Sequence, residues 1–218
     1  MKKIIALLLA SVVAFSAVAE ESKYSNYIGA GLNGLFSNLK VDDDGSRSSL
    51  GGGANFSILG VNNLSGLTVK FDFTLGASST KDIPAEDRLT GLFGALDAGF
   101  GYSFIHNEDT VLSLLGIISA SSSSYNGEVE SKIGDVKLED ESITISTVGI
   151  GADLTFIQRI SGNLHFFASA NARYIWTGSE DRKLSGEVDD VEYYNGISRN
   201  VTGIIEVVPT LGVMWKIR

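Results

Sequence analysis

Residues 67–77 show the clearest alternation of apolar and polar side chains in the chain. The odd-numbered positions from Leu67 to Ala77 are apolar, whereas the even-numbered positions carry Thr, Lys, Asp and Gly. Successive side chains of a β-strand point to opposite faces, so the segment is predicted to be a strand with one apolar and one polar face. Its length suits a bilayer, which a tilted strand of roughly 9–11 residues can cross, whereas strands of soluble domains average about 5–6.

Similar alternation elsewhere predicts eight strands in all. They cover residues 27–37, 49–59, 67–77, 89–104, 110–122, 143–156, 164–176 and 201–217. The sixth strand changes phase, because Ile143 and Ile145 are followed by Val148. This change predicts a β-bulge near Ser146 and Thr147. A second irregularity is expected at Pro209, which cannot donate a hydrogen bond to a neighbouring strand.

The predicted connections alternate between long and short. The long loops are 40–48, 78–88, 125–141 and 178–200, all net acidic, and the short turns are 60–66, 106–109 and 157–163. Up-and-down outer-membrane barrels have short turns at one end and long loops at the other. The predicted fold is therefore all-β, an eight-stranded antiparallel up-and-down transmembrane β-barrel formed by one domain, residues 20–218.

The alternation alone does not say which face meets lipid, because a soluble barrel with an apolar core gives the same pattern. The polar face consists mainly of Gly, Ser, Thr and Asn, which suit a narrow interior better than a solvent-exposed surface rich in Lys and Glu. Aromatic residues gather near the strand ends and are predicted to form two interfacial girdles. The girdle residues are Tyr27, Tyr102, Phe104, Tyr174, Trp176 and Trp215. The apolar face is accordingly predicted to contact lipid.

The first nineteen residues have the features of a secretory signal peptide. Lys2 and Lys3 precede an apolar run, and Ala17-Val18-Ala19 forms a small-residue cleavage site. Cleavage leaves 15 basic and 26 acidic residues, a net charge of −11, which argues against nucleic acid as a partner. Cysteine is absent, which excludes disulfides and thiolate sites.

The C-terminal strand carries a pattern similar to the assembly signal of outer-membrane barrels. Its residues are Thr210, Gly212, Trp215 and Ile217, although the chain ends in Arg218 instead of an aromatic residue. Over all eight strands the mature chain resembles small outer-membrane proteins of the OmpX, OmpW and OmpA-transmembrane-domain type, with spirochaetal versions among the candidates. This resemblance implies a monomer in outer-membrane lipid, folded by the barrel-assembly machinery, with periplasmic termini and extracellular loops.

The predicted interior carries several charged residues. They are Lys70, Asp72, Asp97, Asp153, Arg173 and Glu206. Unpaired charges in a narrow, dry interior cost several kcal/mol each, so the two cations and four carboxylates are expected to pair. An eight-stranded barrel is just wide enough to be filled by side chains. The network is interpreted as a packed polar plug, with a narrow hydrated path as the alternative.

Two functions remain open from the sequence. One is a structural or surface-interaction role, in which the four acidic loops bind a host or environmental ligand. The other is a small pore for minor or hydrophobic solutes. An enzyme is not expected, because the only histidines, His106 and His165, lie near the short turns, away from the long loops. No catalytic residue, metal site or cofactor is predicted.

Overall fold

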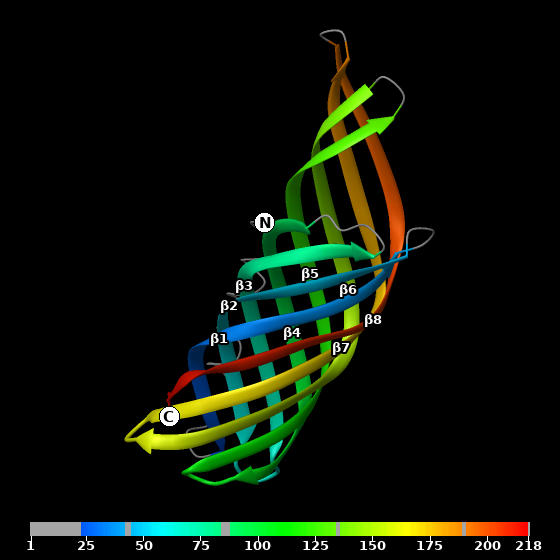
Figure 1. Ribbon diagram of the computed structural model, residues 1–218. Helices are drawn as coiled ribbons and strands as arrows, with labels where there is room; N and C mark the ends of the chain where they lie inside the picture. Colours follow the sequence, from blue (N-terminus) through cyan, green and yellow to red (C-terminus); the bar gives the residue numbers. More distant parts are fainter. Residues whose placement is uncertain (1–22, 42–44, 84–87, 134–135, 189–190, 218) are drawn as a thin grey trace.

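Eight antiparallel strands close into a single barrel in the computed structural model, which describes residues 23–41, 45–83, 88–133, 136–188 and 191–217 (Figure 1). The strands are β1 (Tyr24–Val41), β2 (Gly45–Asn62), β3 (Leu67–Ile83), β4 (Arg88–His106), β5 (Thr110–Ile133), β6 (Val136–Ser161), β7 (Leu164–Val188) and β8 (Val191–Lys216). Each strand pairs with the next, and β8 closes the ring on β1. The predicted eight-stranded up-and-down barrel is confirmed. The predicted signal peptide, residues 1–19, lies outside the described residues.

The described residues contain no helix that is long and apolar enough to cross a membrane.

The two ends of the barrel differ. At one end, here called the turn end, short turns join β2 to β3, β4 to β5 and β6 to β7, next to the start of β1 and the end of β8. Gly66 and Gly162 lie in two of these turns with φ of 76° and 53°, a conformation that favours glycine. The opposite end is called the hairpin end, because β5–β6 and β7–β8 continue there as long hairpins.

The strands at the hairpin end are longer than the sequence pattern predicts. β5 to β8 contain 24 to 26 residues, against 17 to 19 for β1 to β4, so the β5–β6 and β7–β8 hairpins rise well beyond the other half of the barrel (Figure 1). The predicted loops 125–141 and 178–200 are therefore wrong as loops and are mostly strand, and much of 40–48 and 78–88 is strand as well. Their polar composition misled the prediction, because stretches rich in polar residues and glycine are also typical of loops.

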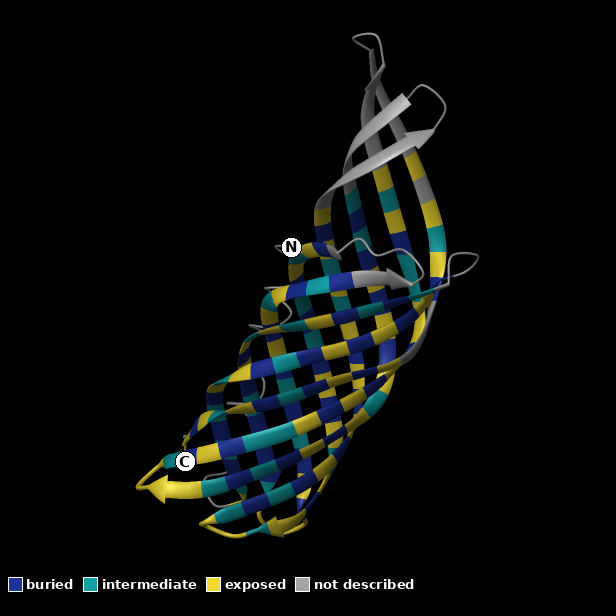
Figure 2. Ribbon diagram, in the orientation of Figure 1, coloured by how far each residue is buried: buried dark blue, intermediate teal, exposed yellow. Residues whose placement is uncertain are grey.

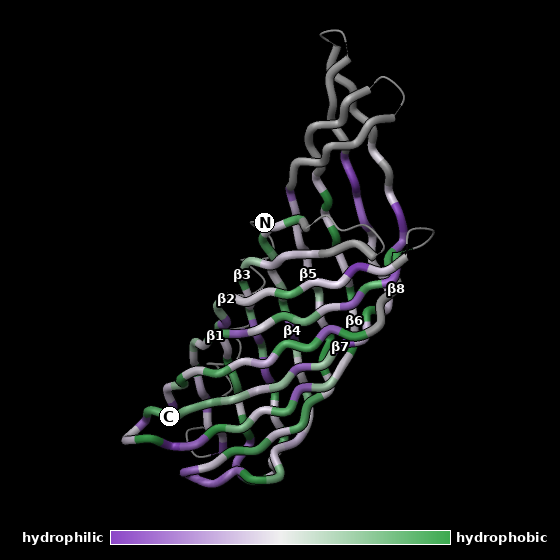
Figure 3. The backbone as a smooth tube through the Cα atoms, viewed as in Figure 1, coloured by the Kyte–Doolittle hydropathy of each residue, from purple (hydrophilic) through white to green (hydrophobic). Residues whose placement is uncertain are grey.

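The predicted bulge near Ser146 and Thr147 is also wrong. Burial alternates without a break from Ser142 to Ile157 of β6, with Ile143, Ile145 and Thr147 facing inward and Val148 facing outward (Figure 2). Hydropathy also alternates along the strands (Figure 3), but in β6 the apolar residues change sides while the backbone keeps its phase. The change therefore lies in which residues are apolar and not in the backbone.

A bulge does occur on the neighbouring strand. Val148 pairs with Thr177 and Gly149 pairs with Ile175, which leaves Trp176 as an extra residue in β7. A similar shift between β1 and β8 follows Asn38, so both β7 and β8 reverse phase at the same level. Beyond this level Glu180 is buried, whereas Asp181 and Lys183 are exposed.

Pro209 lies in β8 opposite Ala170 of β7. On its other side the ladder to β1 is interrupted between the pairs Asn33–Thr210 and Phe36–Val207, although the register is kept. The missing amide hydrogen of proline accounts for weakened pairing at the seam where the barrel closes.

Candidate functional site in the barrel interior

A first charge cluster surrounds Lys70 of β3. Its Nζ lies 3.0 Å from Oδ2 of Asp72 and 3.1 Å from Oδ2 of Asp153, and it donates a hydrogen bond to Thr155 Oγ1 at 3.0 Å. Ser57 donates a hydrogen bond to Asp72. All of these side chains are buried. One ammonium group therefore links a carboxylate of its own strand to a carboxylate of β6, although β4 and β5 lie between the two strands.

A second charge cluster surrounds Arg173 of β7. Its Nη2 lies 2.6 Å from Asp97 Oδ2, and its Nη1 lies 3.5 Å from Glu206 Oε2. Its Nε donates to Asn171 Oδ1 at 3.2 Å, and Asn171 in turn donates to Asp97 at 3.1 Å. The structure thus brings the six sequence-predicted interior charges into two adjacent groups, which meet where Asp72 and Asp97 are cross-strand partners.

A further buried ion pair was missed by the sequence pattern. Arg47 of β2 and Glu180 of β7 are buried, with Nε 2.6 Å from Oε2 and Nη2 3.0 Å from Oε1. Both residues fall within the predicted polar loops. Glu180 also has the parity of outward-facing residues if β7 is continued without interruption, and only the bulge at Trp176 turns it inward. The sequence pattern predicted neither the strands at these two positions nor the bulge in β7.

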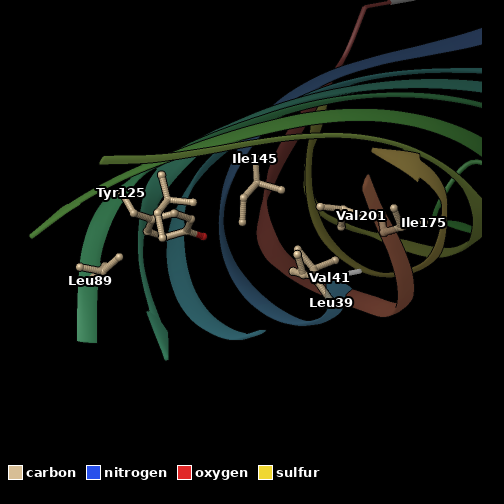
Figure 4. Close-up of a cluster of buried hydrophobic side chains, with 8 residues drawn as sticks. Leu39, Val41, Leu89, Tyr125, Ile145, Ile175 and Val201 are labelled. Atoms are coloured by element: carbon tan, nitrogen blue, oxygen red, sulfur yellow. The ribbon is translucent and has the colours of Figure 1, made fainter. Parts of the chain in front are cut away.

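Apolar side chains fill the interior above and below the charges. At the turn end the buried residues are Tyr27, Leu59, Val61, Val111, Ile157, Phe167 and Met214. At the hairpin end a second cluster, shown in Figure 4, contains Leu39, Val41, Leu89, Tyr125, Ile143, Ile145, Ile175 and Val201. Leu35, Phe93 and Val208 form a smaller group. These layers fill the interior with side chains, as expected for eight strands.

The outer surface of the barrel carries apolar side chains all the way round. Large apolar side chains are exposed on every strand, including Leu32, Leu50, Leu75, Leu92, Ile118, Ile150, Trp176 and Leu211. A soluble monomer rarely exposes an apolar patch of more than a few hundred Å², whereas a continuous outward apolar band is the mark of a membrane barrel. We call this surface the apolar belt.

The apolar belt ends near Val148 and Trp176 on the side of the hairpin end, which we call its upper edge. At this level the apolar residues pass from the outer face to the inner face. Below this level the outside is apolar, and the middle of the interior holds the two charge clusters. Above it, Ile143, Ile145 and Tyr125 are buried inside. The outward positions there are polar, including Ser122, Ser124, Ser146, Thr177 and Asp181. The part of the barrel beyond the belt is thus built like a soluble β-structure, with its own apolar core.

Five of the six predicted girdle residues point outward. Tyr102, Phe104 and Trp215 are exposed near the turn end, and Tyr174 and Trp176 are exposed at the upper edge of the belt. Tyr27 is a correction, because it is 1% exposed and lies inside the barrel, where its ring meets the His165 ring edge-on at 5.2 Å. Its odd-numbered position is in phase with the inward-facing Ser25, not with the outward apolar row of β1.

The residues of the predicted assembly signal occupy different environments. Thr210 is buried, whereas Trp215 and Ile217 are exposed on the outer face. A Cβ at Gly212 would lie 2.3 Å from the Ala30 carbonyl oxygen and 2.6 Å from Phe167 Cε1, so glycine has a packing reason here. Recognition of these residues by the assembly machinery stays a prediction.

The chemistry available in the described interior is that of paired charges. Both histidines lie at the turn end, where His106 Nδ1 is 3.0 Å from the Ser103 carbonyl oxygen and His165 Nδ1 is 2.9 Å from that of Asn163. The described residues contain no group of three or more His, Cys, Asp or Glu side chains placed to hold a metal ion.

No protein-family model matches the sequence, and no curated protein matches it. Solved structures do match. A major outer membrane protein from Thermus thermophilus is 11% identical, with a TM-score of 0.56 over 87% of this chain and 98% of that chain. The outer membrane protease OmpT from Escherichia coli is 9% identical, with a TM-score of 0.50 over 90% of this chain and 97% of that chain. At such identities the likeness concerns the fold. The chain therefore has the fold of outer-membrane β-barrel proteins.

Proposed function

We propose that the protein resides in a bacterial outer membrane, where its filled barrel anchors a surface for interaction with other molecules. The observation that carries this proposal is the extension of β5 to β8 beyond the apolar belt, 24 to 26 residues long against 17 to 19 in the other half. A rigid scaffold that holds a surface segment clear of its own bulk is a common arrangement for binding.

The extended sheet also offers open edges. The last pairing of β5 with β4 joins Asn126 to Thr90, and the last pairing of β8 with β1 joins Val201 to Val41. Farther toward the hairpin tips, β5 and β8 have no second partner strand among the described residues. The backbone groups along these edges are available to an extended segment of another molecule.

The filled interior supports an anchoring role over a pore. The turn end is occupied by the apolar cluster around Phe167 and Met214, and the middle by the two charge clusters. A continuous water path would have to cross both. The histidines at the turn end likewise support a non-enzymatic role, and the likeness to the protease OmpT concerns the fold alone.

We further propose that the hairpin end is extracellular, the termini are periplasmic and the protein is a monomer. The chain has no cysteine, so single cysteines provide unique labels. Lys183→Cys, at an exposed position of the extension, should react with a membrane-impermeant maleimide on intact cells. Asn163→Cys, in a turn at the opposite end, should react only after the outer membrane is permeabilised. The reverse result would invert the orientation.

Conductance and binding separate the two candidate roles. Purified protein in a planar bilayer should show no reproducible unit conductance, and steps that change when Asp97 or Arg173 is replaced would favour a pore. A variant with the β5–β6 and β7–β8 hairpins shortened to the length of β1–β2 should keep the barrel. Cells displaying it should lose adhesion to surfaces that bind cells with the full-length protein, and equal adhesion would remove the interaction role.

A further inference from the structure

A small cavity lies in the interior toward the hairpin end, next to the Arg173 cluster. Its volume is about 10 Å³, which is close to the space that one water molecule requires. Six hydroxyl-bearing residues, one carboxylate and three aliphatic residues line it. They are Ser37, Ser49, Ser121, Ser123, Tyr125, Thr147, Glu206, Leu35, Leu39 and Ile145.

Glu206 lines this cavity and has one carboxylate oxygen that lacks a hydrogen bond. Its side chain is 6% exposed, and its Oε1 accepts a hydrogen bond from Ser37 at 3.1 Å. Its Oε2 is buried without a hydrogen bond, and the nearest cation, Nη1 of Arg173, lies 3.5 Å away. A buried carboxylate oxygen left in this state carries a considerable desolvation cost. A small occupant of the cavity would relieve that cost.

The charge balance specifies the sign of the occupant. The two central clusters contain the cations Lys70 and Arg173 and four buried carboxylates, so they carry two surplus negative charges when all are ionised. Arg173 is shared between Asp97 and Glu206, and its contact with Asp97 is the shorter one. Glu206 is therefore the less compensated of the two carboxylates. Uncompensated charge in a buried interior is strongly unfavourable.

We propose that the cavity beside Glu206 binds a monovalent metal cation of the size of Na⁺. Oxygen atoms are the ligands that hard cations prefer, and the polar part of the lining consists of one carboxylate and neutral hydroxyl groups, with Leu35, Leu39 and Ile145 completing the wall. Ca²⁺ takes six to eight oxygen ligands, usually from several carboxylates, and Mg²⁺ keeps much of its water shell. A single carboxylate in a space for one small occupant matches a single positive charge. The bound ion neutralises Glu206 and stabilises the folded barrel.

The test compares sodium chloride with choline chloride at equal ionic strength, so that screening is the same and only the small ion differs. The full mature chain is folded in detergent micelles, and the Tm is measured in each salt. A bound ion stabilises only the folded state, so the wild type should melt about 2–4 °C higher in sodium chloride, corresponding to roughly 1 kcal/mol for a chain of this size. Glu206→Gln should abolish this difference, whatever its own baseline Tm.

Two control variants make the result specific. Asp109→Asn removes an exposed carboxylate at the turn end and should keep the full sodium effect. Thr147→Val removes a hydroxyl group from the lining while it nearly keeps the shape of the side chain. This hydroxyl lies 2.6 Å from Ser121 Oγ. The variant should show a smaller Tm difference between the two salts. Thr147→Val decides the matter if Glu206→Gln does not fold. Equal wild-type Tm values in the two salts would assign the cavity to a water molecule and overturn the proposal. So would a sodium effect that survives in Glu206→Gln.

Discussion

The guanidinium group of Arg47 and the carboxylate of Glu180 form a buried two-point ion pair across the barrel interior. β2 and β7 are not neighbours, because β1 and β8 lie between them. The pair therefore ties two walls together at the base of the extended hairpins. It exists only because the extra residue Trp176 reverses the phase of β7.

Breaking this pair from one side should be strongly destabilising. Glu180→Gln removes the carboxylate that accepts two hydrogen bonds from the buried Arg47 guanidinium, and because breaking a buried ion pair from one side is costly, we expect a loss of about 3–5 kcal/mol in the free energy of unfolding. The double variant Arg47→Met with Glu180→Leu removes both charges and should recover most of the loss. Urea unfolding of the protein in detergent micelles measures both. A single variant as stable as the wild type would show that the pair contributes nothing.

Deleting Trp176 should reproduce the loss by a different route. Without the extra residue, β7 keeps its original phase and Glu180 turns outward, away from Arg47. We expect a destabilisation similar to that of Glu180→Gln, and little further loss when the two changes are combined, because both remove the same interaction. Trp176→Leu keeps the residue count and the outward position, and serves as the control. The expectation fails if the deletion and Glu180→Gln destabilise additively.

Arg173 should matter far more than an exposed arginine. Arg173→Ala leaves Asp97 and Glu206 buried without their cation, and about 3–5 kcal/mol of stability should be lost. Arg159→Ala is the matched control, because Arg159 and Asp109 form an ion pair 3.3 Å apart at the turn end with side chains 41% and 66% exposed. Such pairs contribute about 0–1 kcal/mol. Thermal unfolding should rank the two variants clearly, and an unchanged Tm for Arg173→Ala would contradict a paired network.

The strands of the belt could be predicted from the sequence because the surrounding lipid enforces alternation there. The outward rows of residues 67–77 and 164–176 have to be apolar at every second position, which leaves a regular signal. The interior charges followed from the same parity, since Lys70 and Asp72 occupy the polar face of the first of these strands. Tyr27 was misplaced because it was grouped with the outward row of β1, although its position is in phase with the inward row.

Beyond the belt the sequence signal reverses, and that part of the prediction was wrong. Ile143 and Ile145 look out of phase with Val148 only if one medium is assumed along the whole strand. The same assumption turned the polar outer rows of the extended hairpins into loops. The inward position of Glu180 could not be predicted for a further reason. It depends on an extra residue in β7, and such a residue leaves no mark in the composition.

The exchange of faces near Val148 should mark the boundary between lipid and water. Ile150 and Ser146 both face outward on β6, one below and one above this level. In lipid vesicles, an environment-sensitive fluorophore on Ile150→Cys should emit at shorter wavelength and resist a water-soluble quencher. The same probe on Ser146→Cys should be quenched readily, because its position is predicted to stand in water. Equal quenching at the two sites would mean that the boundary lies elsewhere and that the apolar core around Ile143 has a different origin.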